Sequence, residues 1–217
     1  MIRYKMHPFE RIPWCAELLQ KPGVVTFTPA ARLPKSADGR YPSQDQLFKT
    51  TLKTSETVPN YIGFYQSPFE NLEKTSLLPQ DQSKPRLLVN SASLLIDLRP
   101  GINGFNATAH GGFIACLFDE IMGSLMFASG EEYRQAEARG ITLPDNLLRF
   151  HDEIVFTVGM NFKLIKAIAT PQVVIATAAF DRIEGRKLFL SYAIQDSEGT
   201  YLAKGEGIWA IVRKQKL

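Results

Sequence analysis

The last third of the chain contains four stretches of apolar and β-branched residues that are separated by short polar segments. These stretches are EIVFTVGMNFKLIKAI (153–168), QVVIATAAFDRIE (172–184), KLFLSYAIQDSEG (187–199) and TYLAKGEGIWAIVRK (200–214). Stretches of this composition are typical of β-strands. Turn sequences around Gly185 and Gly199 join the last three stretches closely. The pattern therefore predicts about four antiparallel strands arranged as a meander.

A long apolar helix is predicted just before these strands, from about residue 109 to residue 128. Its apolar side chains recur at the spacing of one broad helix face: Ile114, Leu117, Phe118, Ile121, Met122 and Leu125. We expect this face to pack on the sheet. Residues 129–150 contain EEYRQAEARG, which indicates a helical insertion or an extension of the same helix.

Strands are also predicted before the helix. YIGFYQ (61–66) has strand composition, and RLLVNSASLLIDLRPG (86–101) predicts one long strand or two short ones that stop at Pro100 and Gly101. One helix with strands on both sides of it in the sequence favours an α+β architecture, in which an antiparallel sheet curls around a central helix.

The beginning of the chain has a less regular pattern. RIPWCAELL (11–19) and DQLFKTTLKT (45–54) predict short helices, and PAARLPKSADGRYPSQ (29–44) predicts a loop. We interpret residues 1–59 as an N-terminal extension or arm, and residues 60–217 as the main domain.

Composition excludes several classes of protein. With 217 residues, 45% of them hydrophobic, the chain can bury a substantial core, which argues against global disorder. A net charge of +3 is too mild to indicate nucleic-acid binding, although it suits a phosphate-bearing ligand. The best candidate for a membrane span, residues 112–128, is interrupted by Asp119 and Glu120. Two cysteines and no signal-peptide pattern predict a cytoplasmic protein, with a mitochondrial one as the alternative.

The predicted helix begins with two glycines. Gly111 and Gly112 fall in the first turn, where backbone N–H groups have no helical acceptor and the helix dipole is positive. A carbonyl could approach these donors as in an oxyanion hole for acyl transfer. The alternative is that the glycines permit close packing or a tight entry turn. We expect His110, just before them, to orient groups at the site rather than to transfer a proton.

Asp119 lies seven residues after Gly112 and therefore on the same side of the helix. Along the axis the two are about 10 Å apart, at ~1.5 Å per residue. One substrate carbonyl cannot reach both on a single helix, so a shared site requires the acid of a second subunit, as in a two-fold dimer. The alternative is a structural acid at the dimer interface. Glu120 is about 100° further around the helix and is expected at the rim of the site.

Other catalytic motifs are absent from the sequence. It contains no GxSxG, HExxH, GxxxxGK[ST] or GxGxxG. We therefore predict no metal site and no separate cofactor. Cys116, inside the apolar helix, is expected to be a packed thiol rather than a nucleophile.

HGGFIACLFDEIMG (110–123), followed by the predicted strands, resembles the hotdog-fold acyl-CoA thioesterases. It is most similar to the branch of the phenylacetate-pathway thioesterase and the mammalian carboxy-terminal modulator protein. Members of that branch carry His-Gly-Gly and then Asp nine positions after the His, and His110 and Asp119 fit this spacing. Thr157 and Asn161 match the Thr and Asn of a family strand.

A further stretch, DRIEGRKLFLS (181–191), resembles a hairpin of the modulator protein, so that the similarity covers roughly residues 60–213.

The resemblance implies a hotdog fold and a homodimer, or a dimer of such dimers, with sites at the subunit interface. It assigns Asp119 as general base or nucleophile across the interface from the glycine N–H groups. Thr157 would help to hold the attacking water on the same subunit as Asp119. Two departures are visible. The interval between Asp119 and Thr157 is longer than usual, and Gly104 stands where some relatives have Asn, flanked here by the substitute candidates Asn103 and Asn106.

An acyl-CoA substrate brings phosphates that need cations. The candidates border the predicted strands and their hairpin turn: Lys163, Lys166, Arg182, Arg186 and Lys187. Asn161 is a further candidate for substrate binding. The alternative for each cation is a solvated charge at a strand edge.

Together these patterns predict a thioesterase that hydrolyses an acyl-CoA, with coenzyme A as part of the substrate. A second interpretation is the release of an acyl chain from a carrier protein in a biosynthetic pathway. A third is a non-catalytic acyl-CoA-binding protein on the same fold. The acyl group is left open, because Phe113, Phe118 and Met122 suit both an acyl tunnel and an ordinary core.

Overall fold

Seven strands form one antiparallel sheet in the order β1-β2-β3-β7-β8-β9-β6. The computed structural model describes residues 7–34, 44–69, 84–150 and 153–213. The strands of the sheet are β1 (Val24–Phe27), β2 (Tyr61–Gln66), β3 (Ser91–Leu98), β6 (Glu153–Leu164), β7 (Gln172–Glu184), β8 (Lys187–Gln195) and β9 (Tyr201–Arg213). A separate hairpin pairs β4 (Asn103–Phe105) with β5 (Thr108–Ala109).

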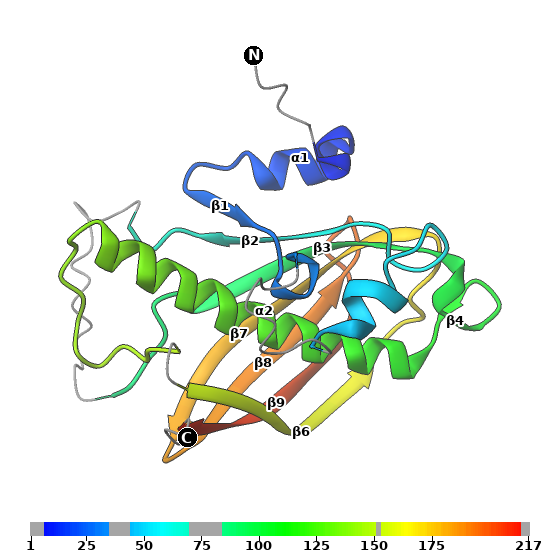
Figure 1. The fold of residues 1–217 in the computed structure, drawn as a ribbon. Helices are drawn as coiled ribbons and strands as arrows, with labels where there is room; N and C mark the ends of the chain where they lie inside the picture. The colour runs from blue at the N-terminus through cyan, green and yellow to red at the C-terminus, as the bar shows by residue number, and fades with distance from the viewer. Residues whose placement is uncertain (1–6, 35–43, 70–83, 151–152, 214–217) are drawn as a thin grey trace.

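One long helix, α2 (Gly111–Ala138), lies across one face of the sheet (Figure 1). The predicted extension beyond residue 128 is confirmed, since the helix runs ten residues further. All six side chains of the predicted apolar face are buried, at 0–1% exposed. By length and hydropathy alone α2 would also suit a membrane span, but its apolar face is packed against the sheet. The predicted α+β architecture is therefore confirmed.

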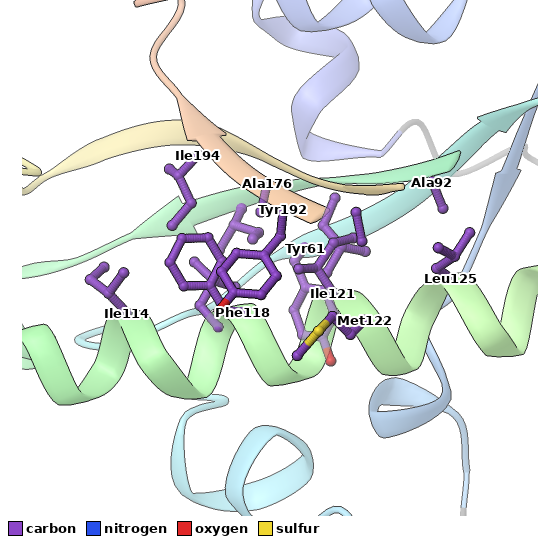
Figure 2. Packing of buried hydrophobic residues seen from close by; sticks show 14 of the residues in the cluster. Tyr61, Ala92, Ile114, Phe118, Ile121, Met122, Leu125, Ala176, Tyr192 and Ile194 are labelled. Atoms are coloured by element: carbon purple, nitrogen blue, oxygen red, sulfur yellow. The ribbon is translucent and has the colours of Figure 1, made fainter. Parts of the chain in front are cut away.

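The core between α2 and the sheet is aromatic at its centre (Figure 2). The ring of Phe118 lies 4.1 Å from that of Tyr192 on β8 and 5.4 Å from that of Phe162 on β6, between centroids. Met122 reaches β9 at Gly207, where a Cβ would come within 2.4 Å of the methionine sulfur. The missing side chain at Gly207 lets the helix lie close to the sheet.

The four C-terminal strands do not form the predicted meander. β7, β8 and β9 are consecutive neighbours, but β6 pairs with β9 at the sheet edge, and β7 pairs with β3. Residues 165–171 bond to the β4–β5 hairpin instead of closing a turn: Ala109 N–H donates to the Ile168 carbonyl, and Thr170 N–H to the Ala107 carbonyl. Apolar alternation shows which face of a strand is buried and does not show which strand lies beside it.

The N-terminal segment wraps around one edge of the sheet and packs on both faces. It contains η1 (Pro8–Arg11), α1 (Pro13–Leu19), β1, η2 (Ala30–Arg32) and η3 (Leu47–Thr51). The two predicted helices are confirmed, the second as a π-helical turn. α1 covers the face opposite α2 (Figure 1). There Phe9 and Cys15 pack on Leu95. Both Cys15 and Cys116 are free thiols.

β1 was not predicted. It has four residues and is defined by its pairing with β2 rather than by a pattern of its own. The predicted strand at 61–66 is confirmed as β2, and the strand within 86–101 as β3, followed by η4 (Pro100–Ile102).

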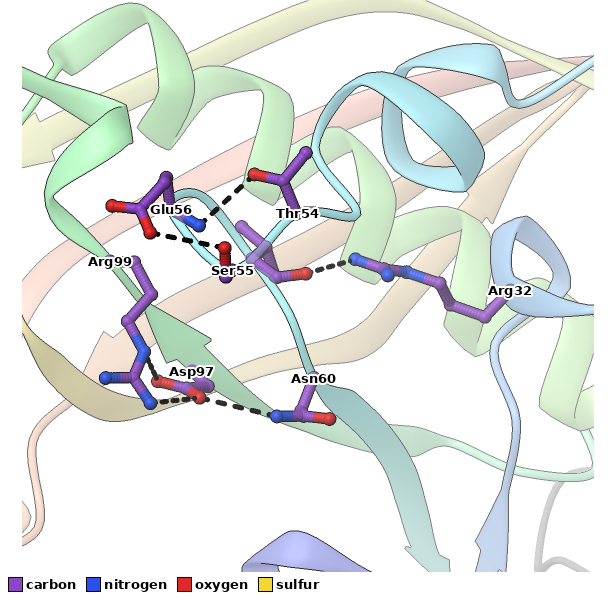
Figure 3. A network of polar contacts seen from close by, with 8 residues as sticks. Arg32, Thr54, Ser55, Glu56, Asn60, Asp97 and Arg99 are labelled. Carbon is purple, nitrogen blue, oxygen red and sulfur yellow. Dashed lines mark hydrogen bonds and ion pairs between the residues drawn. The ribbon is translucent and has the colours of Figure 1, made fainter.

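A polar network ties the segment before β2 to its neighbours (Figure 3). Asp97 on β3 is buried and accepts hydrogen bonds from Arg99 Nη2 at 2.9 Å and Asn60 Nδ2 at 3.5 Å. Arg32 of η2 donates to the Val58 carbonyl at 2.7 Å. The N-terminal segment is therefore held in place by specific bonds as well as by apolar contact.

Candidate active site

The start of α2 is built by the β4–β5 hairpin that precedes it. His110 is the N-cap residue, and its Nδ1 accepts a hydrogen bond from the Gly112 backbone N–H at 2.9 Å. The ring fits because residue 104 is glycine, where a Cβ would come within 2.6 Å of the His110 Cδ2. A ligand carbonyl at this turn would meet the Gly111 N–H, or would replace His110 as the acceptor for Gly112.

The structure brings Asp119 and Thr157 together. The Thr157 hydroxyl on β6 donates a hydrogen bond to Oδ1 of Asp119 on α2, although 38 residues separate them in sequence. Both side chains are exposed in the single chain. Oδ2 of Asp119 has no hydrogen-bond partner among the residues that the structure describes, so it is open to a water molecule or a substrate atom.

The glycine turn and the acid occupy different places along one helix. About 10 Å of helix axis separates Gly112 from Asp119. Beside Asp119, the edge strand β6 exposes Phe156, Val158 and Met160 by 54%, 58% and 38%. An apolar strand edge of this kind is normally covered by another surface.

Glu120, which was expected at the rim, instead points under the N-terminal segment. The Tyr61 hydroxyl on β2 donates to Glu120 Oε1 at 2.8 Å, and the Arg32 guanidinium carbon lies 4.5 Å from the centroid of the Tyr61 ring. Burial raises the pKa of Glu120 to about 7, and the hydrogen bond from Tyr61 opposes that rise. The two neighbouring acids therefore have different surroundings, because Asp119 faces solvent and Glu120 faces the arm.

The predicted asparagines are scattered. Asn103 is held by the Thr170 hydroxyl, which donates to its Oδ1, and Asn106 is exposed at the hairpin turn. Asn161 lies on the sheet face opposite α2, where it lines a hollow of about 700 Å³ together with Lys163. None of the three contacts Asp119 within the described part of the chain.

The predicted cations fall into two groups at opposite ends of the sheet. Lys163 pairs in register with Lys204 on β9, and Lys166 follows just after β6. Lys187 instead pairs with Ala210, six residues further along β9 and about 20 Å away at ~3.3 Å per residue. One chain therefore does not gather all five cations around a single ligand.

Within the second group, Arg182 is in ion pairs with Asp181 and Glu184 at 2.6 Å each. Arg186 donates through Nε to the Ile211 carbonyl at 3.0 Å. Both side chains thus already have partners in the chain itself.

Three residues around Asp119, Glu120 and Thr157 were not predicted from the sequence. Tyr61 on β2 contacts both Glu120 on α2 and Arg32 on η2. No regular spacing in the sequence connects these three residues. Trp209 is the cross-strand partner of Thr157. The apolar alternation of β9 places Trp209 on the buried face, but its neighbour could be found only from the register.

Residues 106–203, which run from the β4–β5 hairpin into β9, match the family model of the thioesterase superfamily. This segment is a thioesterase-superfamily domain. The family and the hotdog fold expected from the sequence are thereby confirmed. The narrower branch suggested by the His-Gly-Gly motif stays a prediction.

Known proteins similar to this chain include verlamelin biosynthesis protein B of Lecanicillium sp. The two are 26% identical over 188 residues, and the match covers 83% of this chain and 78% of that protein. A hypothetical thioesterase with coenzyme A from Streptococcus pneumoniae TIGR4 is 14% identical, with 62% and 86% covered and a TM-score of 0.45. The smu.793 protein from Streptococcus mutans UA159, bound to acetyl CoA, is 13% identical, with 62% and 88% covered and a TM-score of 0.45.

Proposed function

We propose that this protein is an acyl-CoA thioesterase that works as a homodimer. The observation that carries the proposal is the hydrogen bond from Thr157 to Asp119 inside a thioesterase-superfamily domain. It holds a carboxylate at the surface of the core helix with one oxygen oriented and the other open. Such a carboxylate can take a proton from water or attack a carbonyl itself.

In the proposed reaction the thioester carbonyl lies at the first turn of the partner's α2. The Gly111 N–H and the positive end of the helix dipole stabilise the oxyanion, and the Gly112 N–H joins them when the carbonyl oxygen replaces His110 as its acceptor. Asp119 either deprotonates the water that adds to the carbonyl carbon, or adds directly to form an anhydride that water then opens. In both routes the carbon–sulfur bond breaks, and the thiolate of coenzyme A leaves and takes up a proton.

Two observations support the proposed dimer. The ~10 Å between Gly112 and Asp119 prevents one helix from supplying both halves of a site. The apolar edge of β6, at Phe156, Val158 and Met160, lies beside Asp119 and is free to pair with a second copy. Two such edges related by a two-fold axis would set the helices side by side, so that each brings its first turn near the acid of the other.

A second candidate function is the release of an acyl chain from a carrier protein. It is favoured by the similarity to a protein that is named for biosynthesis. Both functions use the same chemistry and differ in the group that carries the thiol.

The test is a thiol-release assay with short, long and aromatic acyl-CoAs and with the matching acyl-carrier proteins, applied to the wild type and to Asp119→Asn. We expect the substitution to lower turnover by about 100-fold or more, because a positioned acid–base group contributes 10²–10⁴-fold. Glu198→Gln, which changes an exposed acid in a distant turn, is the control and should keep full turnover. Full turnover by Asp119→Asn would exclude the proposed mechanism, and binding without release by the wild type would favour a non-catalytic protein.

A further inference from the structure

The indole of Trp209 is a buried hydrogen-bond donor that lacks an acceptor. Trp209 on β9 is 7% exposed, and its Nε1 has no hydrogen-bond partner in the part of the chain that the structure describes. A buried N–H left unpaired costs about 1–3 kcal/mol. Native proteins keep few such groups, and a functional role is one explanation for a group that persists.

This donor lies next to the proposed catalytic pair. Trp209 is paired directly with Thr157 across β9 and β6, so the two side chains lie on the same face of the sheet, with their Cβ atoms about 5 Å apart. On the helix, Gly123 follows Asp119 by one turn. A Cβ at Gly123 would lie 3.5 Å from Cη2 of the indole, so the ring packs against the helix backbone at that point.

The surroundings of the indole are apolar. Leu188 on β8 is its cross-strand partner on the other side, and Met122 contacts the sheet two residues before it, at Gly207. Leu188 and Met122 are fully buried. On α2, the carboxylate of Glu120, which follows Asp119, accepts a hydrogen bond from Tyr61. The N–H of Trp209 is therefore an unpaired donor among apolar neighbours, on the sheet face that carries Thr157.

We propose that Trp209 determines the acyl specificity of this site, because its indole N–H donates a hydrogen bond to a hydroxyl or keto oxygen on the acyl chain. The oxygen lies within the first few carbons of the thioester, since Trp209 is the immediate neighbour of Thr157. The proposal rests on the proposed thioesterase function. A plain acyl chain leaves the donor unpaired, and a site that is built to hydrogen-bond a substrate oxygen discriminates against the analogue without it.

The test compares Trp209→Phe with the wild type on octanoyl-CoA and on octanoyl-CoA bearing a hydroxyl at carbon 3, 4 or 5. The substitution keeps an aromatic ring and removes only the N–H and part of the indole. We expect the ratio of kcat/KM for the best hydroxyacyl substrate over the plain substrate to fall about 5- to 10-fold, which corresponds to about 1 kcal/mol for one neutral hydrogen bond. Trp14→Phe changes the other tryptophan, on the far face of the sheet, and should leave the ratio unchanged.

An unchanged ratio in Trp209→Phe would overturn the proposal. Loss of the dimer in that variant, measured by light scattering, would also overturn the proposal, because the N–H would then serve the subunit interface. If the wild type releases no thiol from any thioester, the proposed function fails, but the donor can still be tested by binding. In Trp14→Phe the tryptophan fluorescence, excited at a wavelength that tyrosine does not absorb, comes from Trp209 alone. Titration with the same thioesters should show at least 5-fold tighter binding of one hydroxyacyl form, and equal binding of all forms would again contradict the assignment.

Discussion

Thr157 contributes to the proposed chemistry only through the hydroxyl that it donates to Asp119. Thr157→Ser keeps that donor and Thr157→Ala removes it. We expect kcat to fall about 10- to 100-fold in the alanine variant, since a hydrogen bond to a charged group contributes about 1.5–3 kcal/mol, and to stay within a few-fold in the serine variant. Steady-state thiol release measures both, and equal losses would show that the hydroxyl has no part in turnover.

Glu120 should make stability depend on pH. Its pKa is about 7 in the folded chain against an ordinary value of 4.5, because burial disfavours the charged form. The folded state therefore holds a proton more tightly than the unfolded state. The stability linked to Glu120 is fully present below pH 4.5 and is lost as the pH rises through about 7.

Glu120→Gln keeps an acceptor for Tyr61 and removes this titration. Relative to the wild type, the free energy of unfolding of the variant should increase between pH 4.5 and pH 8 by on the order of 2–3 kcal/mol. Urea unfolding at several pH values measures the difference. Glu198→Gln should track the wild type throughout, and a Glu120→Gln curve parallel to the wild type would contradict the assignment.

Individual residues were predictable to different degrees. Asp119 and Thr157 belong to a spaced motif, so the sequence singled them out before their contact was known. Trp209 and Tyr61 have no motif, and their neighbours depend on strand register and on the path of the N-terminal segment. Local patterns carry no information about such distant contacts.

At the scale of elements, α2 and the sheet depend on one buried face. Phe118 is 0% exposed between α2 and the sheet, whereas Phe105 in the β4–β5 hairpin is 79% exposed. We expect Phe118→Ala to lower the free energy of unfolding by about 3–5 kcal/mol, from lost contact and the cavity left behind. Phe105→Ala should change it by less than about 0.5 kcal/mol. Denaturant unfolding of the two variants measures both changes. Equal losses of unfolding free energy would contradict the observed packing.

The spacing of apolar residues predicted most of these elements but did not predict the order of the strands in the sheet. The helix face and strands β2 and β7 follow directly from apolar spacing. β1 has four residues and is a strand only because it pairs with β2. β6 goes to the sheet edge because the chain after it is bonded to the β4–β5 hairpin, a contact between segments about sixty residues apart.

For the whole molecule, the exposed edge of β6 is the proposed dimer surface. Val158→Glu places a charge on this edge, and we expect a monomer by light scattering together with loss of thiol release, because a charge buried without a partner disfavours association. Leu47→Glu changes a comparably exposed apolar residue on η3, 44% exposed, and should leave the dimer intact. A dimeric Val158→Glu protein would show that this edge is not the interface.

The central claim is that each site combines Asp119 of one subunit with the glycine turn of the other. Asp119→Asn and Gly112→Val each damage a different half of both sites, so each homodimer should be inactive. In a mixed dimer of the two variants, one site receives both intact halves. Co-purified mixed dimers, isolated with two different affinity tags and assayed for thiol release, should therefore recover about half of wild-type turnover. Turnover no higher than that of the two parent homodimers would contradict the shared site.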